Sequence, residues 1–496
     1  MLIWATETFR WTGIVLFILI MFLLLPGGRP KNFPPGLPIL PLLGSLLTMR
    51  GGPTRQILLN LKKTYGNMAS FGIFGTRVVL VSGLPALKEI FSHKASTGRP
   101  DLIFTTTRNL LLSEGRNTEL GVVGSSGSMW QEQRRFVLHQ LRDLGFGKSS
   151  YEPIMMQEIT ELMEYFNQED GLPICMKNTF NRSVVNVLWG MVMGKRYPYH
   201  HAKLRMLLET FVSRGDINLL SPLFFIPGFL RALPNLPLLN RKVDSIRKVL
   251  GFVKDEIQEL SSQDLSFNKS LAAAYLREIR SRKDESSDFH MDQLVAVLSE
   301  MFVAGMETTS STLAMGIYLL AKNPKIQQRL QQEMDQVVGR DMLPTFSDIE
   351  RLPYTLATIH EVQRKLNLVI YALPHAAIQD CTFAGYDIPR GTVLLPNVGD
   401  TMSDPQLWKN PREFDPENFL NDDGSYRKNE AFLPYSTGKR RCVGESLARQ
   451  ELFLFLSCLL HRFSFTLVEE EDPPITNPVF NTAPAYSAKA IPRGSI

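Results

Sequence analysis

Cysteine is scarce in this sequence, with four residues among 496. They are Cys175, Cys381, Cys442 and Cys458. None of them forms a C-x-x-C pair, and their spacing resembles neither a zinc site nor a disulfide framework. So few cysteines are typical of a protein from a reducing compartment. A cysteine with a special role in this chain therefore has to act singly.

An excess of charge of one sign is lacking as well. The formal net charge is +5 at pH 7, which gives no argument for a nucleic-acid partner. Charged residues make up 21% and hydrophobic residues 44% of the chain, so the composition is that of an ordinary globular protein. No internal repeat or low-complexity tract stands out.

The N-terminal apolar run is shorter than a usual membrane span. Trp11–Leu25 is uncharged over fifteen residues, whereas a spanning helix needs about 20. A cleaved signal peptide or a core helix are alternatives, but no A-x-A-like cleavage site follows. Instead Pro30–Gly44 is rich in proline, which makes a stiff connector, and the basic residues Arg29 and Lys31 favour a cytosolic body. We therefore expect a membrane anchor over residues 1–28, a proline-rich hinge over 29–45 and a folded body over 46–496.

Helical patterns dominate the body and strand-like runs are short, which predicts a mainly α fold with small β-sheets. The clearest helical patterns are Tyr151–Phe166, Lys203–Val212, Val243–Leu260 and Leu447–Leu460. The strand-like runs are Val78–Val81, Ala372–His375, Thr392–Leu395 and Phe463–Val468. We interpret the polar Ser281–Phe289 as a surface connection. The prolines of Leu219–Leu238 favour an apolar loop near a membrane over a core helix.

One cysteine lies in a segment whose residue types suit a metal thiolate. Tyr435–Gly444 reads YSTGKRRCVG, and a strongly helical segment follows. Gly438 and Gly444 can adopt positive φ and let the backbone approach a flat ring. The N-terminus of the following helix would stabilise a negative charge on Cys442, and Arg440 offers a guanidinium fork to a carboxylate. A buried structural cysteine is the alternative.

This segment resembles the haem-binding loop of the cytochromes P-450, F-x-x-G-x-R-x-C-x-G. Gly438, Arg440, Cys442 and Gly444 match it at every required spacing, whereas Tyr435 stands where the family usually has phenylalanine. The resemblance implies that Cys442 is the axial thiolate ligand of a haem b iron, and that residues 46–496 form one catalytic domain with the cytochrome P-450 fold. The hydroxyl of Tyr435 needs a partner if it is buried, and near the sulfur it could tune the iron potential.

A second motif resembles the family's K helix. Glu361 and Arg364 stand at i, i+3 in LPYTLATIHEVQR, on one helical face, where the family's pair locks the haem-side core. Taken alone, this spacing is more often a surface ion pair. The family's third partner usually comes from a P-E-R-F-like segment. Asn418 replaces its arginine here, so we expect a neutral hydrogen-bonding group.

A periodic helical pattern over Asp292–Ala321 carries the stretch AGMETT, which begins at Ala304. Small residues let a flat cofactor approach such a helix, and the hydroxyl of Thr308 could bond to the carbonyl of Ala304. An acid beside an alcohol offers a proton path into an apolar pocket, with a solvated helix patch as the alternative. The stretch resembles the family's oxygen-activating motif A-G-x-E/D-T, which implies catalytic roles for Glu307 and Thr308.

Further residues resemble the family's donors to the haem carboxylates. Trp130 and Arg134 form a W-x-x-x-R pair in WQEQRRFVLHQLRDLGFGK, a sequence that resembles the microsomal family-2 group. His375 in ALPHAAIQD matches another propionate donor, although a lone histidine is usually structural. Arg99 in GRPD is a further candidate for this role.

The resemblance spans essentially the whole chain and implies a monooxygenase that inserts one atom of O2 into a small lipophile. Electrons would come from NADPH through a flavoprotein reductase, at the endoplasmic reticulum membrane with the catalytic domain on the cytosolic side. Basic residues expected to dock an acidic reductase are Arg135, Arg142, Lys439 and Arg441. Residues expected to line an apolar pocket are Phe302, Ala304, Gly305, Thr309, Val369, Ile370, Tyr371 and Leu373, with parts of 102–123.

The segment from Arg99 to Trp130 resembles the arthropod branch of this group, which includes enzymes that oxidise ecdysteroids and sesquiterpenoid juvenile-hormone precursors. On this analogy the narrowest expectation is epoxidation of a farnesoate-type acid or ester, with ecdysteroid hydroxylation or broad xenobiotic oxidation as alternatives. Ile370 and Tyr371 replace the proline of the family-2 pattern, which should reshape the pocket wall. Two other classes stay open: an NADPH-independent haem-thiolate isomerase and a non-catalytic haem sensor.

Overall fold

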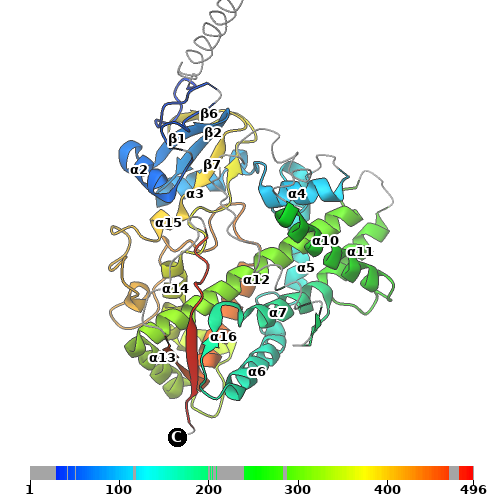
Figure 1. The fold of residues 1–496 in the computed structure, drawn as a ribbon, viewed down its shortest axis with the longest axis vertical. Coiled ribbons are helices and arrows are strands. Elements are labelled where there is room, and N and C mark those ends of the chain that lie inside the picture. The colour runs from blue at the N-terminus through cyan, green and yellow to red at the C-terminus, as the bar shows by residue number, and fades with distance from the viewer. Residues whose placement is uncertain are drawn as a thin grey trace, which may run out of the picture.

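The computed structural model describes residues 29–41, 43–50, 52–114, 119–198, 201–202, 204, 208, 240–282, 287–468 and 480–494. The expected anchor over 1–28, the segment Leu219–Leu238 and most of Lys203–Val212 lie outside these residues. Within them helices dominate and the sheets are small, as the sequence predicts (Figure 1). No helix in the described ranges has the length and apolar character needed to cross a membrane.

The helices and strands keep their numbering in Figure 1. The helices are α2 (Arg55–Tyr65), α3 (Leu84–Ser92), α4 (Ile103–Leu112), α5 (Gly127–Asp143), α6 (Glu152–Gln168), α7 (Asn181–Met193), α10 (Asn240–Ser261), α11 (Leu271–Ser281), α12 (Met291–Lys322), α13 (Pro324–Val337), α14 (Pro353–Leu366), α15 (Val398–Thr401) and α16 (Glu445–Arg462). The strands are β1 (Met68–Ile73), β2 (Thr76–Val81), β3 (Ile174–Cys175), β4 (His375–Ala376), β5 (Cys381–Phe383), β6 (Tyr386–Ile388), β7 (Val393–Pro396), β8 (Phe463–Leu467) and β9 (Ser487–Pro492).

The largest sheet has the strand order β1-β2-β7-β4 and includes the first strands of the chain (Figure 1). β1 and β2 form an antiparallel hairpin, whereas β2 and β7 are parallel, with Val78 opposite Val393. The proline-rich segment lies along β1, because the N–H of Leu37 donates to the carbonyl of Ser70 at 2.9 Å. A Cβ on Gly36 would lie 1.7 Å from that same oxygen. The described part of the expected hinge is therefore packed onto the edge of this sheet.

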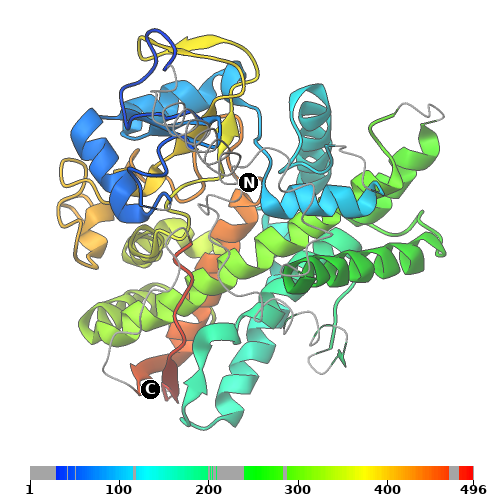
Figure 2. The same ribbon diagram turned by 45° about the horizontal axis from the view of Figure 1, so that its top comes forward.

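α12 is the central helix of the helical part of the molecule, and it crosses the body in both views (Figures 1 and 2). It packs against α7, α10, α14 and α16. It confirms the helical pattern predicted over residues 292–321 and extends it by one residue at each end. The helix begins after His290, whose ring nitrogen accepts the N–H of Gln293 at 3.4 Å, and Pro324 starts the next helix.

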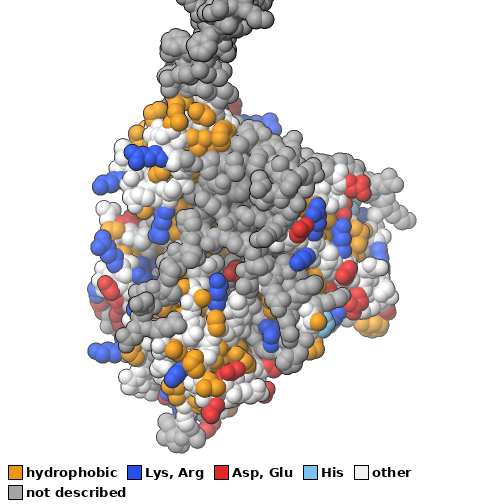
Figure 3. All heavy atoms as spheres, in the orientation of Figure 1, with side chains coloured by type: hydrophobic (Ala, Val, Ile, Leu, Met, Phe, Trp, Pro, Cys, Tyr) orange, Lys and Arg blue, Asp and Glu red, His pale blue; other side chains and the backbone are white. Residues whose placement is uncertain are grey.

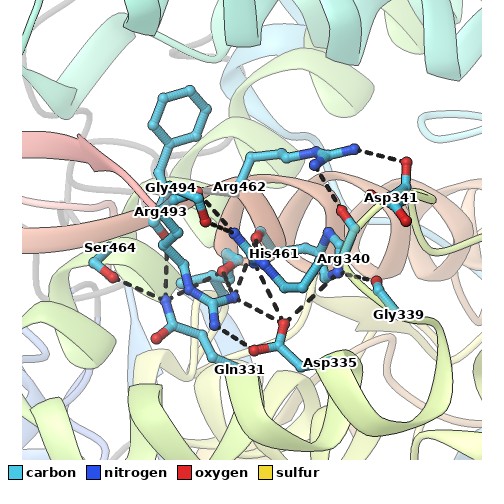
Figure 4. A network of polar contacts seen from close by, with 12 residues as sticks. Gln331, Asp335, Gly339, Arg340, Asp341, His461, Arg462, Ser464, Arg493 and Gly494 are labelled. Carbon is cyan, nitrogen blue, oxygen red and sulfur yellow. Dashed lines mark hydrogen bonds and ion pairs between the residues drawn. The ribbon is translucent and has the colours of Figure 1, made fainter. Parts of the chain in front are cut away.

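A polar network fixes the C-terminal strand to the ends of α13 and α16 (Figure 4). Asp335 accepts hydrogen bonds from Arg340 at 3.3 Å and from Arg493 at 2.6 Å. Arg340 also donates to the carbonyl of His461 at 2.6 Å, and Nε2–H of His461 donates to the carbonyl of Gly339 at 2.8 Å. The last carbonyls of a helix have no partner inside it, so these arginines stabilise the end of α16. The other end of α16 follows the cysteine segment.

The surface shown in Figure 3 carries charged side chains of both signs over most of its described area. Hydrophobic side chains gather at the end of the molecule where β1 and β2 lie (Figure 3). Leu47, just before α2, is 59% exposed, and Leu59 within α2 is 39% exposed. The N-terminal region of the body thus presents apolar side chains to its surroundings.

Candidate active site

The segment Tyr435–Gly444 forms a tight turn that leads into α16. Gly438 has a φ of 79°, as predicted. A Cβ at this position would lie 1.9 Å from the carbonyl oxygen of Phe91, so the turn requires glycine. The N–H of Cys442 donates to the carbonyl of Tyr435 at 3.1 Å, which closes the turn.

The prediction of a positive φ at Gly444 is wrong. Its φ is −83° and its ψ is 5°, because Gly444 is the N-cap of α16 and the chain enters the helix without a left-handed residue. A Cβ on Gly444 would stand 3.8 Å from the sulfur of Cys442. That distance is an ordinary van der Waals contact, so neither the space around Gly444 nor its backbone conformation requires glycine in this structure.

Opposing electrostatic influences act on the pKa of the Cys442 thiol. Desolvation and the charge of Glu445 raise the pKa of the thiol, and a backbone hydrogen bond from Gly444 and the charge of Arg134 offset only part of this. The residue itself is exposed, so a ligand can reach it. A metal ion that binds a thiol displaces its proton, and the two lowering influences favour the thiolate that results.

Arg440, two residues before the cysteine, is anchored in the protein core. It is 7% exposed and donates to the carbonyls of Thr97 at 2.9 Å, of Val122 at 3.0 Å and of Ser125. Its guanidinium lies over the ring of Trp130, 3.9 Å from the ring centroid. The cysteine turn is thereby tied to the segments that precede α4 and α5.

Arg99, Arg134 and Arg440 form a cluster of positive charge beside this turn. Arg99 donates to two carbonyls of the segment after α14, at 2.9 and 2.8 Å. Arg134 donates to the carbonyl of Arg441 at 2.6 Å. Desolvation, and then the charges of the other arginines, lower the pKa of Arg440 to about 8 and that of Arg99 to about 9. The three cations therefore repel one another in a poorly solvated place.

The cluster fits a ligand that carries carboxylates. Glu300 attracts Arg99 and Arg440 electrostatically, but it is bound to Arg108 at 2.6 Å. Nε1–H of Trp130 is buried and has no hydrogen-bond acceptor in the part of the chain that the structure describes. A buried N–H without a partner costs free energy, and so does unbalanced buried charge. The propionate groups of the haem that the sequence implies would satisfy both.

His375 lies in β4 beside this cluster. Its Nδ1–H donates to the carbonyl of Ser96 at 2.7 Å, and its ring packs on Phe91 at a centroid distance of 4.5 Å. Burial, together with the charges of Arg99 and Arg440, holds the pKa of His375 well below its ordinary value. The neutral ring has only an acceptor at Nε2, so it donates to a propionate only as an imidazolium that the anion stabilises. Its role as a propionate donor stays a prediction.

The middle of α12 is accessible, although most of the helix is buried. Ala304 is exposed and Thr308 is half-buried. The hydroxyl of Thr308 donates to the carbonyl of Ala304 at 2.8 Å, which confirms the predicted bond. Glu307, one residue before Thr308, is exposed, and the hydroxyl of Ser311 donates to its carboxylate at 3.5 Å. An acid and a hydroxyl thus flank the accessible stretch.

Several residues expected to line the substrate pocket are packed in the core instead. Phe302 packs edge-to-face against Trp189, with ring centroids 5.2 Å apart. The hydroxyl of Thr309 is hydrogen-bonded to Glu451 of α16. Successive residues of an α-helix point in directions about 100° apart, so both side chains lie on the faces of α12 that meet other helices. Gly305 stays partly exposed beside Ala304.

The same correction applies to Ile370 and Tyr371, after α14. Both are buried in the hydrophobic cluster of the large sheet, together with Phe71. The N–H of the residue after Tyr371 donates to the carbonyl of residue 396 at 3.1 Å, so this segment runs along the sheet. Val369 and Leu373 remain partly exposed and stay predicted pocket residues.

The pair Glu361 and Arg364 is a buried lock, as the sequence predicts. Two hydrogen bonds of 2.7 Å join the two side chains, which are 0% and 1% exposed. Arg364 also donates to the carbonyls of residues 402, 411 and 413. Asn418 donates to Glu361 at 3.4 Å and is the neutral third partner that was expected. The lock holds the chain between β7 and the cysteine turn.

Two buried groups near the site were not predicted. Arg108 of α4 pairs with Glu300 of α12 at 2.6 Å, and the other oxygen of Glu300 accepts the N–H groups of Val122 and Val123. This pair therefore fixes the loop whose carbonyls bind Arg440. The second group is Glu451, which faces α12. Neither has a local sequence signal, because each partner lies far away along the chain.

The comparisons with known proteins agree with this site. The Cytochrome P450 family model matches residues 34–489. The chain is 34% identical over 490 residues to Cytochrome P450 2D27 of Mesocricetus auratus, and the aligned region covers 95% of each chain. It is 35% identical over 465 residues to Cytochrome P450 2J1 of Oryctolagus cuniculus, covering 92% of this chain and 90% of the relative. Over 463 residues it is 34% identical to Cytochrome P450 2B2 of Rattus norvegicus, covering 91% of this chain and 92% of the relative.

These relatives confirm the resemblance to the family-2 group, and being mammalian they carry no information on an arthropod branch. The family consists of monooxygenases that bind haem b and receive electrons from NADPH through a reductase. The match covers the cysteine turn, the accessible stretch of α12 and the arginine cluster. This chain belongs to the cytochrome P450 family of haem-thiolate monooxygenases.

Proposed function

We propose that this monooxygenase inserts one oxygen atom into small lipophilic substrates, and that Cys442 would hold the haem as its thiolate ligand. The observation that carries this proposal is the cluster of Arg99, Arg134 and Arg440 around the unpartnered N–H of Trp130, directly beside the cysteine turn. These groups would hold the two propionates. Haem bound through a thiolate supplies O2 binding and O–O cleavage, because the thiolate pushes electron density onto iron.

The chain's own residues supply proton handling on the accessible stretch of α12. The proton of the Thr308 hydroxyl is used in the bond to Ala304, so the lone pairs of its oxygen can accept a hydrogen bond from water. Glu307, one residue earlier and exposed, is an acid within the same stretch. We propose that Glu307 supplies protons to this stretch and that Thr308 positions the water that carries them, as the family motif implies.

The accessible residues predicted to line the pocket favour an apolar substrate. Ala304, Gly305, Val369 and Leu373 offer only apolar atoms to a ligand apart from their backbone. A small lipophile fits such a wall. The narrower proposal, epoxidation of a farnesoate-type acid or ester, is supported only by the resemblance of residues 99–130 to an arthropod branch; ecdysteroid hydroxylation and broad xenobiotic oxidation are the competing proposals.

Incubation under 18O2 with NADPH and a flavoprotein reductase tests the function directly. Farnesoic acid, methyl farnesoate and an ecdysteroid precursor would be supplied separately. A monooxygenase puts one 18O atom into the product and the other into water. A product without 18O would indicate an isomerase, and oxygen consumption without any product would favour a haem sensor. Absence of an epoxide from both farnesoids would refute the narrow proposal alone.

We also propose a reductase dock and a membrane anchor. Arg135, Arg142, Lys439 and Arg441 are all exposed, and the last two belong to the cysteine turn, so they can meet an acidic partner on the thiolate side. Reversal of their charges should slow reduction of the iron and weaken its salt dependence. The apolar end of the body near β1 supports contact with the endoplasmic reticulum membrane beside the expected anchor over 1–28.

A further inference from the structure

Tyr435, which departs from the family's loop pattern, has a hydrogen-bond partner built into α14. Nε2–H of Gln363 donates to the Tyr435 hydroxyl at 2.8 Å. Gln363 is 7% exposed and lies between Glu361 and Arg364, the two residues of the buried lock. α14 therefore forms the buried lock through Glu361 and Arg364 and also contacts the cysteine turn through Gln363.

The ring of Tyr435 is also held from α16. The guanidinium of Arg449 lies 5.0 Å from its ring centroid. Arg449 is oriented by Glu445 at 3.0 Å and by His360 at 3.1 Å. Because a guanidinium only donates, Nε2 of His360 is the acceptor, and its Nδ1–H donates to the hydroxyl of Tyr426 at 2.7 Å. Tyr435 is thus fixed between two helices by groups that are themselves fixed.

This arrangement bears on the cysteine through the backbone. The carbonyl of Tyr435 accepts the N–H of Cys442, so the position of the Tyr435 residue sets that of the ligand residue. Phenylalanine at 435 would keep the contact with Arg449 but remove the acceptor for the Gln363 amide. A buried amide N–H that loses its acceptor is costly, whereas removal of donor and acceptor together is nearly neutral.

We propose that Gln363 is a positioning residue for the thiolate: by holding Tyr435, it keeps Cys442 bound to the haem iron. This inference rests on the proposed role of Cys442 as the haem ligand. Gln363 and Tyr435 then form one unit, and each is useful only in the presence of the other.

The test compares the holoproteins of wild type, Gln363→Leu, Tyr435→Phe and the double variant. The first measurement is the rate at which the reduced carbon monoxide complex loses its red-shifted Soret band under mild denaturation. The second is the rate of unfolding, followed by tryptophan fluorescence. Each single variant should lose the band on the order of tenfold faster than wild type, ahead of unfolding. The double variant should be no worse than either single variant.

Gln327→Leu is the matched control. Gln327 is an equally buried glutamine, 4% exposed, that donates to the carbonyl of Phe465 in β8 at 3.0 Å. Substitution of Gln327 should accelerate the loss of the red-shifted Soret band and the unfolding of the protein to the same extent. Additive effects of the Gln363 and Tyr435 substitutions, or a Gln363→Leu variant that behaves like this control, would overturn the inference alone. A wild-type holoprotein without the red-shifted band would overturn the proposed role of Cys442, and this inference with it.

Discussion

Glu451 connects α16, which follows the cysteine turn, to the oxygen-activating helix α12. It is 2% exposed, its carboxyl group is hydrogen-bonded to Thr309, and its Oε1 has no partner among the described residues. Desolvation raises its pKa from 4.5 to about 8, and the bond to Thr309 offsets only part of this. We expect Glu451→Gln, which keeps the shape and removes the ionisation, to change how stability depends on pH.

The sign follows from the proton that Glu451 binds. The folded protein keeps this proton up to about pH 8, whereas the unfolded chain releases it near pH 4.5. The contribution to stability is therefore fully present below pH 4.5 and is lost as the pH rises to about 8. One pKa unit corresponds to about 1.4 kcal/mol, so the loss approaches roughly 4 to 5 kcal/mol in the free energy of unfolding.

Denaturant unfolding between about pH 5 and about pH 9 measures this effect. The wild-type holoprotein should lose stability relative to Glu451→Gln as the pH rises, with most of the change below about pH 8. Glu445→Gln, at the partly buried start of the same helix, is the control and should not reproduce the effect of Glu451→Gln. Parallel profiles for wild type and Glu451→Gln would refute the reasoning, because they would mean that Glu451 ionises alike in both states.

Three further substitutions test the site. Trp130→Phe should weaken haem binding on the order of 10- to 100-fold, measured by haem transfer to an acceptor protein. The control Trp189→Phe removes another buried indole N–H and should not weaken haem binding. Equal effects of the two substitutions would refute the role of Trp130 in binding a propionate. Arg364→Ala leaves its buried carboxylate partner unpaired and should cost about 3–5 kcal/mol in thermal unfolding; a change below about 1 kcal/mol would contradict the lock. Thr308→Ala should lower the amount of product formed per O2 consumed without altering the carbon monoxide spectrum. The control Thr312→Ala removes the same kind of hydroxyl-to-carbonyl bond one turn later and should leave the product formed per O2 unchanged.

The features predicted most securely from sequence are those fixed by local spacing. The turn around Gly438, the bond from Thr308 to Ala304 and the pair of Glu361 with Arg364 each join residues within a few positions. Their geometry follows from helix periodicity and turn chemistry, so a motif is enough to predict it.

The remaining features depend on how distant segments pack. Ile370 was expected in the pocket, but the strands beside it draw its side chain into the sheet. Gly444 was expected to have positive φ, but the helix that starts there sets its conformation. The pairing of Arg108 with Glu300 and the burial of Glu451 arise only when α4, α12 and α16 come together. None of these could be read from residue spacing.

The carbon monoxide difference spectrum of the reduced protein tests the central claim most directly. If Cys442 binds the haem iron as a thiolate, the Soret band of the wild-type complex shifts strongly to the red, and Cys442→Ser abolishes the shift. Cys458→Ser, at a buried cysteine near the C-terminal end of α16, should leave the shift intact. A wild-type protein without the red shift, or a Cys442→Ser variant that retains it, would contradict the assignment of Cys442 as the ligand.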